Sequence, residues 1–409
     1  MTSEAYVWVW LPGAEEPVPA GIAREQHGIV RFAYGNGYRA RPDAMSLNTV
    51  ELPLVEGFRD PPPGLTVPGC LADAGPDGWG RRVILNRLVG ADGAVDDLSA
   101  LTYLREAGSD RIGALDFQAS PSEYRPRGSS RATLDQLLEF VTNVEEGIPV
   151  PPELDDAMRA GASVGGARPK ALLRDGDREL IAKFSASSDR WSLVRGEFLA
   201  MTMAARCGLD VAPVELARVG DRDVLLVERF DRVPGTRQRR ALLSGLTLLG
   251  LDEMWPGQAA YGDLAELMRT RFTRPQSSRR ELFARLTFNV LCGNTDDHAR
   301  NHAAFWDGRE LTLTPAYDIC PYIRETGEAT QAMRLGRGED PGRLANIGEC
   351  VRRAELFGLS TAQAREIVDA QRETIDAEWN DLCDEAGLTP VDRRLLRNVF
   401  PHEYALYDL

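Results

Sequence analysis

Residues 293–301 read Gly-Asn-Thr-Asp-Asp-His-Ala-Arg-Asn, and a Tyr-Asp pair follows at residues 317 and 318. The segment contains an Asp, then an Asn five residues later, and a second Asp follows further along the chain. This spacing is typical of a protein-kinase-type phosphoryl-transfer site. In such a site the first Asp takes the proton of the attacking hydroxyl, and the other two residues hold magnesium against the phosphates. The sequence offers Asp296, Asn301 and Asp318 for these roles.

A loop of small residues and two short apolar runs lie upstream of this motif. The loop at 162–170 contains Gly165-Gly166, and glycine lets backbone amides approach phosphate groups closely. The runs 171–174 and 180–184 flank a polar turn with Gly176, which predicts a β-hairpin. Lys183 alternates with Ile181 and Phe184, so we expect its ammonium to face the nucleotide.

Two further segments complete a nucleotide-holding half. Residues 191–207 show helical apolar spacing and include Glu197, which suits an ion pair with Lys183. Residues 224–231 form an apolar run that leads into a polar segment. We interpret this run as a buried strand ending in a hinge, where backbone groups can meet the edge of an adenine.

These segments, in this order, resemble the HipA family of serine/threonine kinases, the toxins of HipBA-type toxin–antitoxin modules. The resemblance covers roughly residues 150–375. The front of the chain also resembles the family's N-terminal subdomain, through Pro-Asp-Gly-Trp-Gly-Arg at 76–81 and Asp-Arg-Ile-Gly-Ala-Leu at 110–115. The motifs that carry the resemblance in the kinase part are the loop at 163–170, Ile-Ala-Lys-Phe at 181–184, the hinge at 227–232, the loop at 293–301 and Leu-Thr-Pro-Ala-Tyr-Asp at 313–318.

The resemblance implies a role for each matching position. Asp296 is the expected catalytic base, and Asn301 and Asp318 are the expected magnesium ligands. Ser163 matches a loop serine whose autophosphorylation silences the kinase in the family. The expected ATP-binding residues are Gly165, Gly166, Ala167, Arg168, Pro169, Lys170, Lys183, Glu228, Arg229, Phe230, His298, Arg300, Asn301, Tyr317 and Asp318.

One departure from the family concerns the phosphate loop. Well-known members carry Ala-Gly-Ala-Gln-Glu-Lys there, whereas this chain has Gly-Gly-Ala-Arg-Pro-Lys at 165–170. Pro169 removes one amide donor and Arg168 adds a positive charge. We expect nucleotide binding to survive this change, which bears instead on substrate choice and on the switch at Ser163.

The expected fold class is α+β, a protein-kinase-like bilobal fold with a β-rich N-terminal part and a mainly α-helical C-terminal lobe. We expect three domains: a β-rich subdomain at 1–118, a kinase N-lobe with phosphate loop and hinge at 132–232, and a helical C-lobe at 233–409. Strands are expected at 7–11 and 28–34, and helices at 79–88, 98–107, 134–144 and 281–292. A capping box at 360–363 begins a further helix, and the last helix is expected at 390–400.

Composition limits the remaining functions. The chain has 409 residues and a formal net charge of −14, which disfavours general nucleic-acid binding because phosphate contact depends on Lys and Arg. The Arg-rich segment 237–240 is interpreted as solvated surface. We therefore expect DNA contact only through a helix-turn-helix antitoxin of the HipB type, as the resemblance implies. Six scattered cysteines and the lack of any long apolar run predict a cytoplasmic protein without a membrane span.

The predicted function is transfer of the ATP γ-phosphate, with Mg²⁺, to a hydroxyl on a protein substrate, which family members suggest is a translation component. Two alternatives stay open from the sequence. One is a small-molecule kinase on the same scaffold, because Asp-x4-Asn loops serve those enzymes too. The other is a nucleotide-binding co-repressor that mainly holds an antitoxin.

Overall fold

The computed structural model describes residues 3–76, 78–90, 93–128, 133–146, 148, 168–186, 189, 191–323, 327–338 and 340–407. The chain divides into two compact units. Unit 1 comprises residues 1–186, 217–243 and 305–309, and unit 2 comprises residues 187–216, 244–304 and 310–409. The predicted three-domain division stays a prediction.

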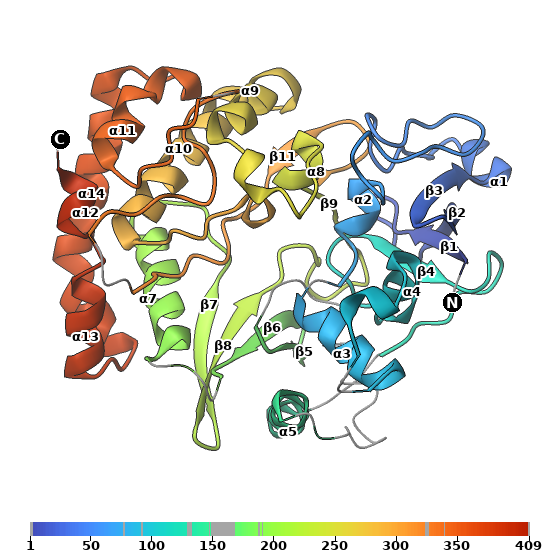
Figure 1. Cartoon of the computed structure of the whole chain (residues 1–409), viewed down its shortest axis with the longest axis horizontal. Coiled ribbons are helices and arrows are strands. Elements are labelled where there is room, and N and C mark those ends of the chain that lie inside the picture. The colour runs from blue at the N-terminus through green and yellow to red at the C-terminus, as the bar shows by residue number, and fades with distance from the viewer. Residues whose placement is uncertain are drawn as a thin grey trace. The chain divides into compact units, whose positions relative to one another are not determined.

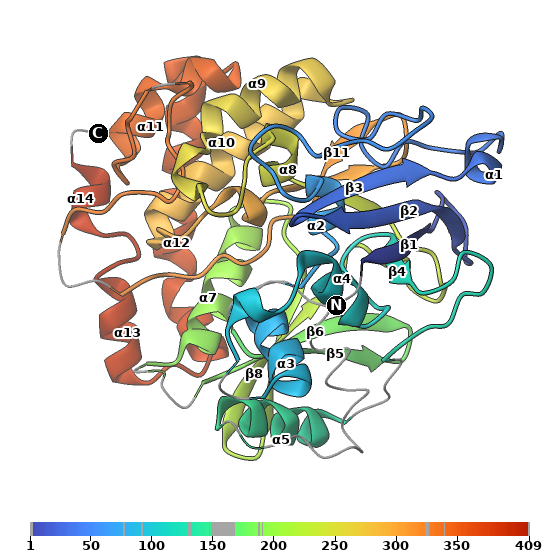
Figure 2. The same cartoon turned by 45° about the vertical axis from the view of Figure 1, so that its right-hand side comes forward.

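Unit 1 begins with an antiparallel sheet in the order β3-β2-β1-β4. Its strands are β1 (Glu4–Val9), β2 (Val18–Gln26), β3 (Ile29–Tyr34) and β4 (Leu115–Gln118). Figure 2 shows β1, β2 and β3 as neighbouring arrows. The register of β1 against β2 shifts between Val7 and Trp8, so this pairing contains an irregularity. The predicted strands at 7–11 and 28–34 correspond to β1 and β3, but β1 starts earlier and ends at Val9.

A second four-stranded sheet has the order β5-β6-β8-β7. Its strands are β5 (Lys170–Asp175), β6 (Arg178–Phe184), β7 (Val214–Val219) and β8 (Arg222–Glu228). β5 and β6 form the predicted hairpin, and Gly176 at the turn has a φ of +60°, a conformation that glycine adopts without strain. β8 pairs antiparallel with β6, with Glu228 opposite Leu180.

Unit 1 contains the helices α1 (Asn36–Arg39), α2 (Gly69–Ala72), α3 (Gly78–Leu88), α4 (Ala100–Glu106) and α5 (Leu134–Glu145). Of these, α3, α4 and α5 complete one apolar core with the second sheet. Thr133 and Gln136 form a capping box that starts α5. Buried residues of α3, α4, α5, β5, β6 and β8 belong to one hydrophobic cluster. The cluster contains Trp79, Val83, Tyr103, Phe140, Val141, Ala171, Leu180, Ala182, Phe184, Val224 and Leu226.

Unit 2 is mainly helical. Its helices are α7 (Leu193–Arg206), α8 (Gly245–Leu249), α9 (Tyr261–Arg271), α10 (Pro275–Cys292), α11 (Ile347–Arg352), α12 (Thr361–Glu385), α13 (Pro390–Arg397) and α14 (Glu403–Leu406). α12 packs against both α7 and α10, as Figure 1 shows. Ser360 and Gln363 form the predicted capping box at the start of α12. The prediction for the last helix was wrong, because α13 ends at Arg397 and α14 follows it.

A small third sheet has the order β11-β10-β9, formed by β9 (Ala241–Ser244), β10 (Ala303–Trp306) and β11 (Leu311–Leu313). Short 3₁₀ helices occur at Val95–Asp97, Pro256–Gln258, Ala299–Asn301 and Ala354–Phe357. Of the helices in the described residues, none combines the length and apolar character needed to cross a membrane.

Candidate active site

The catalytic-loop motif lies at the end of α10 in unit 2. Gly293 caps this helix with a φ of +73°, in the left-handed region that favours glycine. A Cβ atom at this position would lie 2.7 Å from the backbone oxygen of Val399. Any residue other than glycine at position 293 would therefore require the backbone at Val399 to shift.

The predicted base, Asp296, is exposed. The Tyr322 hydroxyl donates a hydrogen bond to its Oδ2 atom over 3.0 Å, and its backbone amide donates to Oδ1 of Asn294 over 3.3 Å. Burial raises the pKa of Tyr322, and the nearby Asp296 raises it further. Tyr322 therefore keeps its proton at neutral pH and remains a donor to Asp296.

The next residue, Asp297, is the centre of a buried cluster that we call the catalytic-loop cluster: Tyr261, Asn289, Asp297 and His302. One carboxylate oxygen, Oδ2, accepts from the Tyr261 hydroxyl, from Nδ2 of Asn289 at 2.7 Å and pairs with Nε2 of His302 at 3.0 Å. Burial by itself would raise the pKa of Asp297, but His302 and the hydrogen bonds hold it below its usual value. The cluster ties the loop to α9 and α10.

The first predicted magnesium ligand, Asn301, is bonded to the loop that carries the base. Its Nδ2 atom donates to the backbone oxygen of Asp296 over 3.5 Å, and its backbone amide donates to the oxygen of His298 over 2.8 Å. With Nδ2 turned toward Asp296, the amide oxygen Oδ1 is the atom that can ligate a cation.

The second predicted magnesium ligand, Asp318, follows a segment that α10 holds in place. The buried guanidinium of Arg285 donates to the backbone oxygen of Thr314 over 2.8 Å. The backbone amide of Ala316 donates to the backbone oxygen of Asp210 over 2.7 Å. Asp318 itself has a φ of +61°. Left-handed backbone at a residue other than glycine costs of order 1–3 kcal/mol and gathers at functional sites.

Of the other predicted nucleotide residues of unit 2, His298 and Arg300 lie on the catalytic loop and Tyr317 lies next to Asp318. The Tyr317 hydroxyl donates to the backbone oxygen of Arg300 over 2.6 Å, which joins the Tyr317-Asp318 segment to the catalytic loop. The guanidinium of Arg300 pairs with Glu253 at 2.8 Å. His298 is half-buried, and its Nδ1 atom has no hydrogen-bond partner within the described part of the chain.

In unit 1, the predicted phosphate-binding lysines lie side by side in the hairpin. Lys170 of β5 is directly opposite Lys183 of β6, so the two side chains share a face of the sheet. Ile181 is on this face as well, whereas Phe184 is on the other face with Leu180 and Ala182. The expected alternation of Lys183 with Ile181 was wrong, because residues two apart in a strand point the same way.

The start of β5 is held by the N-terminal motif at 76–81. The indole Nε1 of Trp79, a side chain that is 1% exposed, donates to the backbone oxygen of Lys170 over 3.2 Å. The amide of Phe184 donates to the oxygen of Pro169 over 3.1 Å. Ser163, Gly165, Gly166 and Ala167 lie outside the described residues, so the predictions for them stay predictions.

The predicted hinge at 227–232 begins in the last two residues of β8. The amide of Arg229 donates to the oxygen of Glu179 over 2.9 Å, and its side chain is 1% exposed among Asp110, Asp231 and the oxygen of Arg111. Because the amide and the side chain of Arg229 already have partners within the chain, only its carbonyl oxygen could serve the predicted hinge contact. Phe230 packs edge-to-face on Phe305, with ring centroids 5.9 Å apart.

Two domain matches decide the family. The HipA-like C-terminal domain matches residues 162–379, and the HipA N-terminal domain matches residues 9–118. The first match alone covers more than half of the 409 residues.

This chain belongs to the HipA family.

Its relatives include kinases of that family. The serine/threonine-protein kinase toxin HipA of Shewanella oneidensis is 26% identical over 273 residues, 60% of this chain and 62% of that protein. The protein Y4mE of Sinorhizobium fredii is 25% identical over 357 residues, 80% of both proteins. The chain is accordingly a serine/threonine protein kinase of the HipA family.

A solved structure confirms the predicted fold class. HipA in the Shewanella oneidensis complex of HipA, HipB and operator DNA matches with a TM-score of 0.69 and 18% identity. The match covers 96% of this chain and 94% of that one. The α+β, protein-kinase-like fold expected from the sequence is therefore the fold of this HipA-family chain.

Sequence reasoning missed several residues that position the site in this HipA-family chain. Asp297 directly follows the predicted base, and its partner Asn289 lies on the predicted helix 281–292, but nothing in the sequence showed that these two residues would meet Tyr261. Tyr322, the hydrogen-bond donor to Asp296, lies beyond the last motif. The interpretation of Arg239 as solvated surface was wrong, because it donates to the oxygen of Ser109 over 2.8 Å and lies 3.6 Å from the Trp10 ring.

Proposed function

We propose that this HipA-family kinase transfers the γ-phosphate of ATP to a serine or threonine hydroxyl of a protein, with Asp296 as the base. The observation that carries the proposal is the hydrogen-bonded connection of the predicted residues in unit 2. Asn301 bonds to the backbone of Asp296, and the Tyr317 hydroxyl bonds to Arg300 of the same loop. The catalytic loop and the Tyr317-Asp318 segment, which the sequence spacing predicted as parts of one site, are therefore joined by hydrogen bonds.

The proposed chemistry is mainly positional. Because Tyr322 occupies Oδ2 of Asp296, Oδ1 is the atom that would accept the proton of the acceptor hydroxyl. The catalytic-loop cluster holds the backbone on either side of this carboxylate, so little rearrangement is needed when the hydroxyl arrives. A positioned general base of this kind contributes roughly 10²–10⁴-fold to the rate.

The residues of unit 1 would bind the nucleotide. Lys170 and Lys183 are opposite each other in the hairpin, so both residues are on the face of the sheet that we propose for the phosphates. Gly165 to Lys170 would complete the phosphate loop, and backbone groups of Glu228 to Phe230 would meet the adenine edge. His298 and Arg300 of unit 2 would contact the phosphates as well.

The donor set suits magnesium. One carboxylate from Asp318 and one amide oxygen from Asn301 are hard oxygen ligands, and Mg²⁺ commonly takes one or two such groups together with phosphates and water. Within the described segments, no group of three or more His, Cys, Asp or Glu residues could hold a metal ion by itself. The ion would neutralise charge on the transferring phosphate.

Regulation and partners follow from the family relationship as part of the proposal. We propose that Ser163 is the autophosphorylation site and that a helix-turn-helix antitoxin of the HipB type binds this chain. The relative from Shewanella oneidensis is seen with HipB and operator DNA, and the net charge of −14 suits a chain that reaches DNA only through its partner. The protein substrate would be a component of translation.

The test is incubation of the purified chain with γ-labelled ATP and Mg²⁺, followed by mass spectrometry. We expect label on the wild type and on Asp381→Asn, an exposed control on α12, and no label on Asp296→Asn. Equal labelling of Asp296→Asn and wild type would contradict the assignment of the base. A parallel screen of small-molecule acceptors separates a protein kinase from a small-molecule kinase.

A second candidate function is that of a nucleotide-binding co-repressor, favoured by the HipA, HipB and operator DNA complex of the relative. This function predicts that a co-purified helix-turn-helix protein retards operator DNA only when the chain is present. Retardation that is unchanged in Asp296→Asn would show that such a role does not need phosphoryl transfer.

A further inference from the structure

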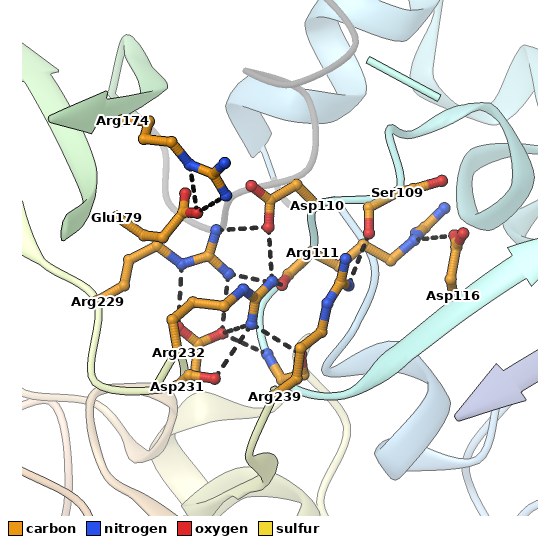
Figure 3. Close-up of polar contacts among 11 residues, drawn as sticks. Ser109, Asp110, Arg111, Asp116, Arg174, Glu179, Arg229, Asp231, Arg232 and Arg239 are labelled. Atoms are coloured by element: carbon orange, nitrogen blue, oxygen red, sulfur yellow. Dashed lines mark hydrogen bonds and ion pairs between the residues drawn. The ribbon is translucent and has the colours of Figure 1, made fainter. Parts of the chain in front are cut away.

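The hinge of unit 1 is bound to a loop more than a hundred residues earlier in the chain. Figure 3 shows the guanidinium groups of Arg229 and Arg232 turned toward Asp110 and the backbone of Arg111. Arg229 donates to Oδ1 of Asp110 over 2.9 Å and to the oxygen of Arg111 over 2.7 Å. We call the set Asp110, Arg111, Gly113, Arg229, Asp231 and Arg232 the hinge network.

Arg232 makes the same connection a second time. It donates to Oδ1 of Asp110 over 2.6 Å, to the oxygen of Gly113 over 3.1 Å and also to the oxygen of Arg111. Asp110 therefore receives two arginines through one carboxylate oxygen. The loop at 110–113 supplies acceptors that fix both ends of the segment 229–232.

Asp231 closes the network from the hinge side. Its carboxylate accepts from Arg229 at 2.9 Å, from Arg232 at 2.8 Å and from the amide of Gly113 at 2.8 Å. Gly113 has a φ of +78°, so its amide points at Asp231 from a backbone conformation that favours glycine. The hinge and the loop thus exchange hydrogen bonds in both directions.

The network is buried and balanced in charge. The side chains of Arg229, Asp231 and Arg232 are 1%, 3% and 8% exposed, and that of Asp110 is 30% exposed. Burial alone would raise the pKa of Asp110, but Arg229, Arg232 and Arg239 hold it well below its usual value. Removing the charge of Asp110 would leave two buried guanidinium groups with one carboxylate between them.

Stability alone is a weak reason for such a network. Buried ion pairs are often replaceable by apolar residues without loss of stability, because desolvation offsets the attraction between the charges. What directional hydrogen bonds supply instead is one fixed geometry. Here the hydrogen bonds fix the backbone directly after Glu228, where the amide of Arg229 also donates to the backbone oxygen of Glu179 of β6.

We propose that Asp110 is a positioning residue for nucleotide binding, which fixes the hinge backbone at 228–230 through Arg229 and Arg232. The inference rests on the proposed function, because it takes this backbone as the adenine-binding segment. Asp110 does not touch the nucleotide in this account. It holds the segment that does, from the part of the chain that matches the HipA N-terminal domain.

The test compares Asp110→Asn with a matched ion pair at the opposite end of β8. Arg222, the first residue of this strand, pairs with Glu145 at 2.9 Å, and the two side chains are 18% and 15% exposed. Glu145→Gln therefore removes a similar charge from the same unit without touching the hinge. ATP affinity is measured by calorimetry, and KM for ATP and kcat are measured by phosphate transfer.

We expect Asp110→Asn to weaken ATP binding and raise KM for ATP by about two- to thirtyfold, the range that coupling through a contact network spans. The value of kcat at saturating ATP should stay near that of the wild type, and Glu145→Gln should leave the ATP affinity unchanged. Arg232→Lys, which keeps the charge but loses the planar fork, should weaken ATP binding in the same direction and is the variant to use if Asp110→Asn does not fold.

The outcomes separate the two levels of inference. A wild type that does not bind ATP overturns the proposed function and this inference with it. A wild type that binds ATP, with Asp110→Asn and Arg232→Lys binding equally well, overturns the positioning role alone. Equal loss of affinity in Asp110→Asn and Glu145→Gln also overturns it, because the effect would then be general destabilisation of unit 1.

Discussion

The hinge network of unit 1 and the catalytic-loop cluster of unit 2 both hold a loop in place, but with different chemistry. In the hinge network two carboxylates, Asp110 and Asp231, face the guanidinium groups of Arg229 and Arg232. In the catalytic-loop cluster a single carboxylate, Asp297, is bonded to a phenol, an amide and an imidazole. The first arrangement depends on balanced charge, whereas the second depends on the number of hydrogen-bond donors. The two loops should therefore fail under different substitutions.

The largest effect is expected at the exposed carboxylate beside the catalytic-loop cluster. Asp296→Asn should lower kcat by roughly 10²–10⁴-fold, because the amide cannot take the proton of the hydroxyl. The melting temperature and ATP affinity should stay close to those of the wild type, since Asp296 is exposed and outside the buried cluster. Single-turnover phosphate transfer and calorimetry measure both. A variant that keeps more than about a tenth of the wild-type rate would contradict the base assignment.

A large loss of stability is expected one residue further on. Asp297→Asn should lower the free energy of unfolding by about 1.5–3 kcal/mol, because the amide oxygen that replaces Oδ2 is uncharged and its hydrogen bonds with Tyr261, Asn289 and His302 are weaker. Urea denaturation of the variant beside the exposed control Asp381→Asn measures this loss. If the two variants unfold at the same urea concentration, the cluster does not hold the loop in the way we describe.

The dependence of the hinge network on charge can be tested with pH. The pKa of Asp110 is lowered in the folded chain, so its contribution to stability is complete above the unfolded pKa of about 3.9 and is lost as the pH falls below it. The stability difference between wild type and Asp110→Asn should be constant above about pH 5 and shrink by up to about 1.4 kcal/mol per pH unit below pH 4. A difference that stays constant down to about pH 2.5 would count against the charge-based account.

The smallest effect is expected for a pair of glycines, one in each region. Gly293 and Gly113 both have positive φ values, of +73° and +78°. A Cβ atom at Gly293 would lie 2.7 Å from the backbone oxygen of Val399, which is a clash. A Cβ atom at Gly113 would have the backbone nitrogen of Leu242 as its nearest neighbour, at 3.5 Å, which is an ordinary contact distance. Gly113→Ala should cost only the conformational penalty of about 1 kcal/mol, and Gly293→Ala should cost more. Thermal unfolding of both variants gives the order, and the reverse order would contradict this reading of the two loops.

The difference between the regions also explains how much could be predicted from the sequence. Asp296, Asn301 and Asp318 could be predicted as site residues because their spacing is set by chemistry that tolerates few arrangements. The hairpin of β5 and β6 and the capping box at Ser360 were found because they depend on neighbours in the sequence. The fold class followed from these motifs taken in order.

What the sequence could not give were the contacts between distant segments. The motif at 110–115 was recognised, but nothing in it showed that Asp110 would meet Arg229 and Arg232. Arg239 belongs to an arginine-rich run that usually indicates solvated surface, and only the folded chain places Trp10 beneath it. The predicted pair of Lys183 and Glu197 stays a prediction, although Glu197 is buried on α7.

The hydrogen bond from Trp79 to Lys170 has a consequence for how the chain is made. Trp79 lies within the match to the HipA N-terminal domain and Lys170 within the match to the C-terminal domain, and both of their segments bury side chains in one cluster. The two sequence domains are therefore not separate folding units. During synthesis, α3 and α4 emerge first with an apolar face that stays uncovered until β5, β6 and β8 follow. A fragment limited to residues 162–379 would lack α3 and α4, so the apolar residues of β5, β6 and β8 that they cover would be exposed. We therefore expect this fragment to aggregate, although it carries every predicted catalytic residue.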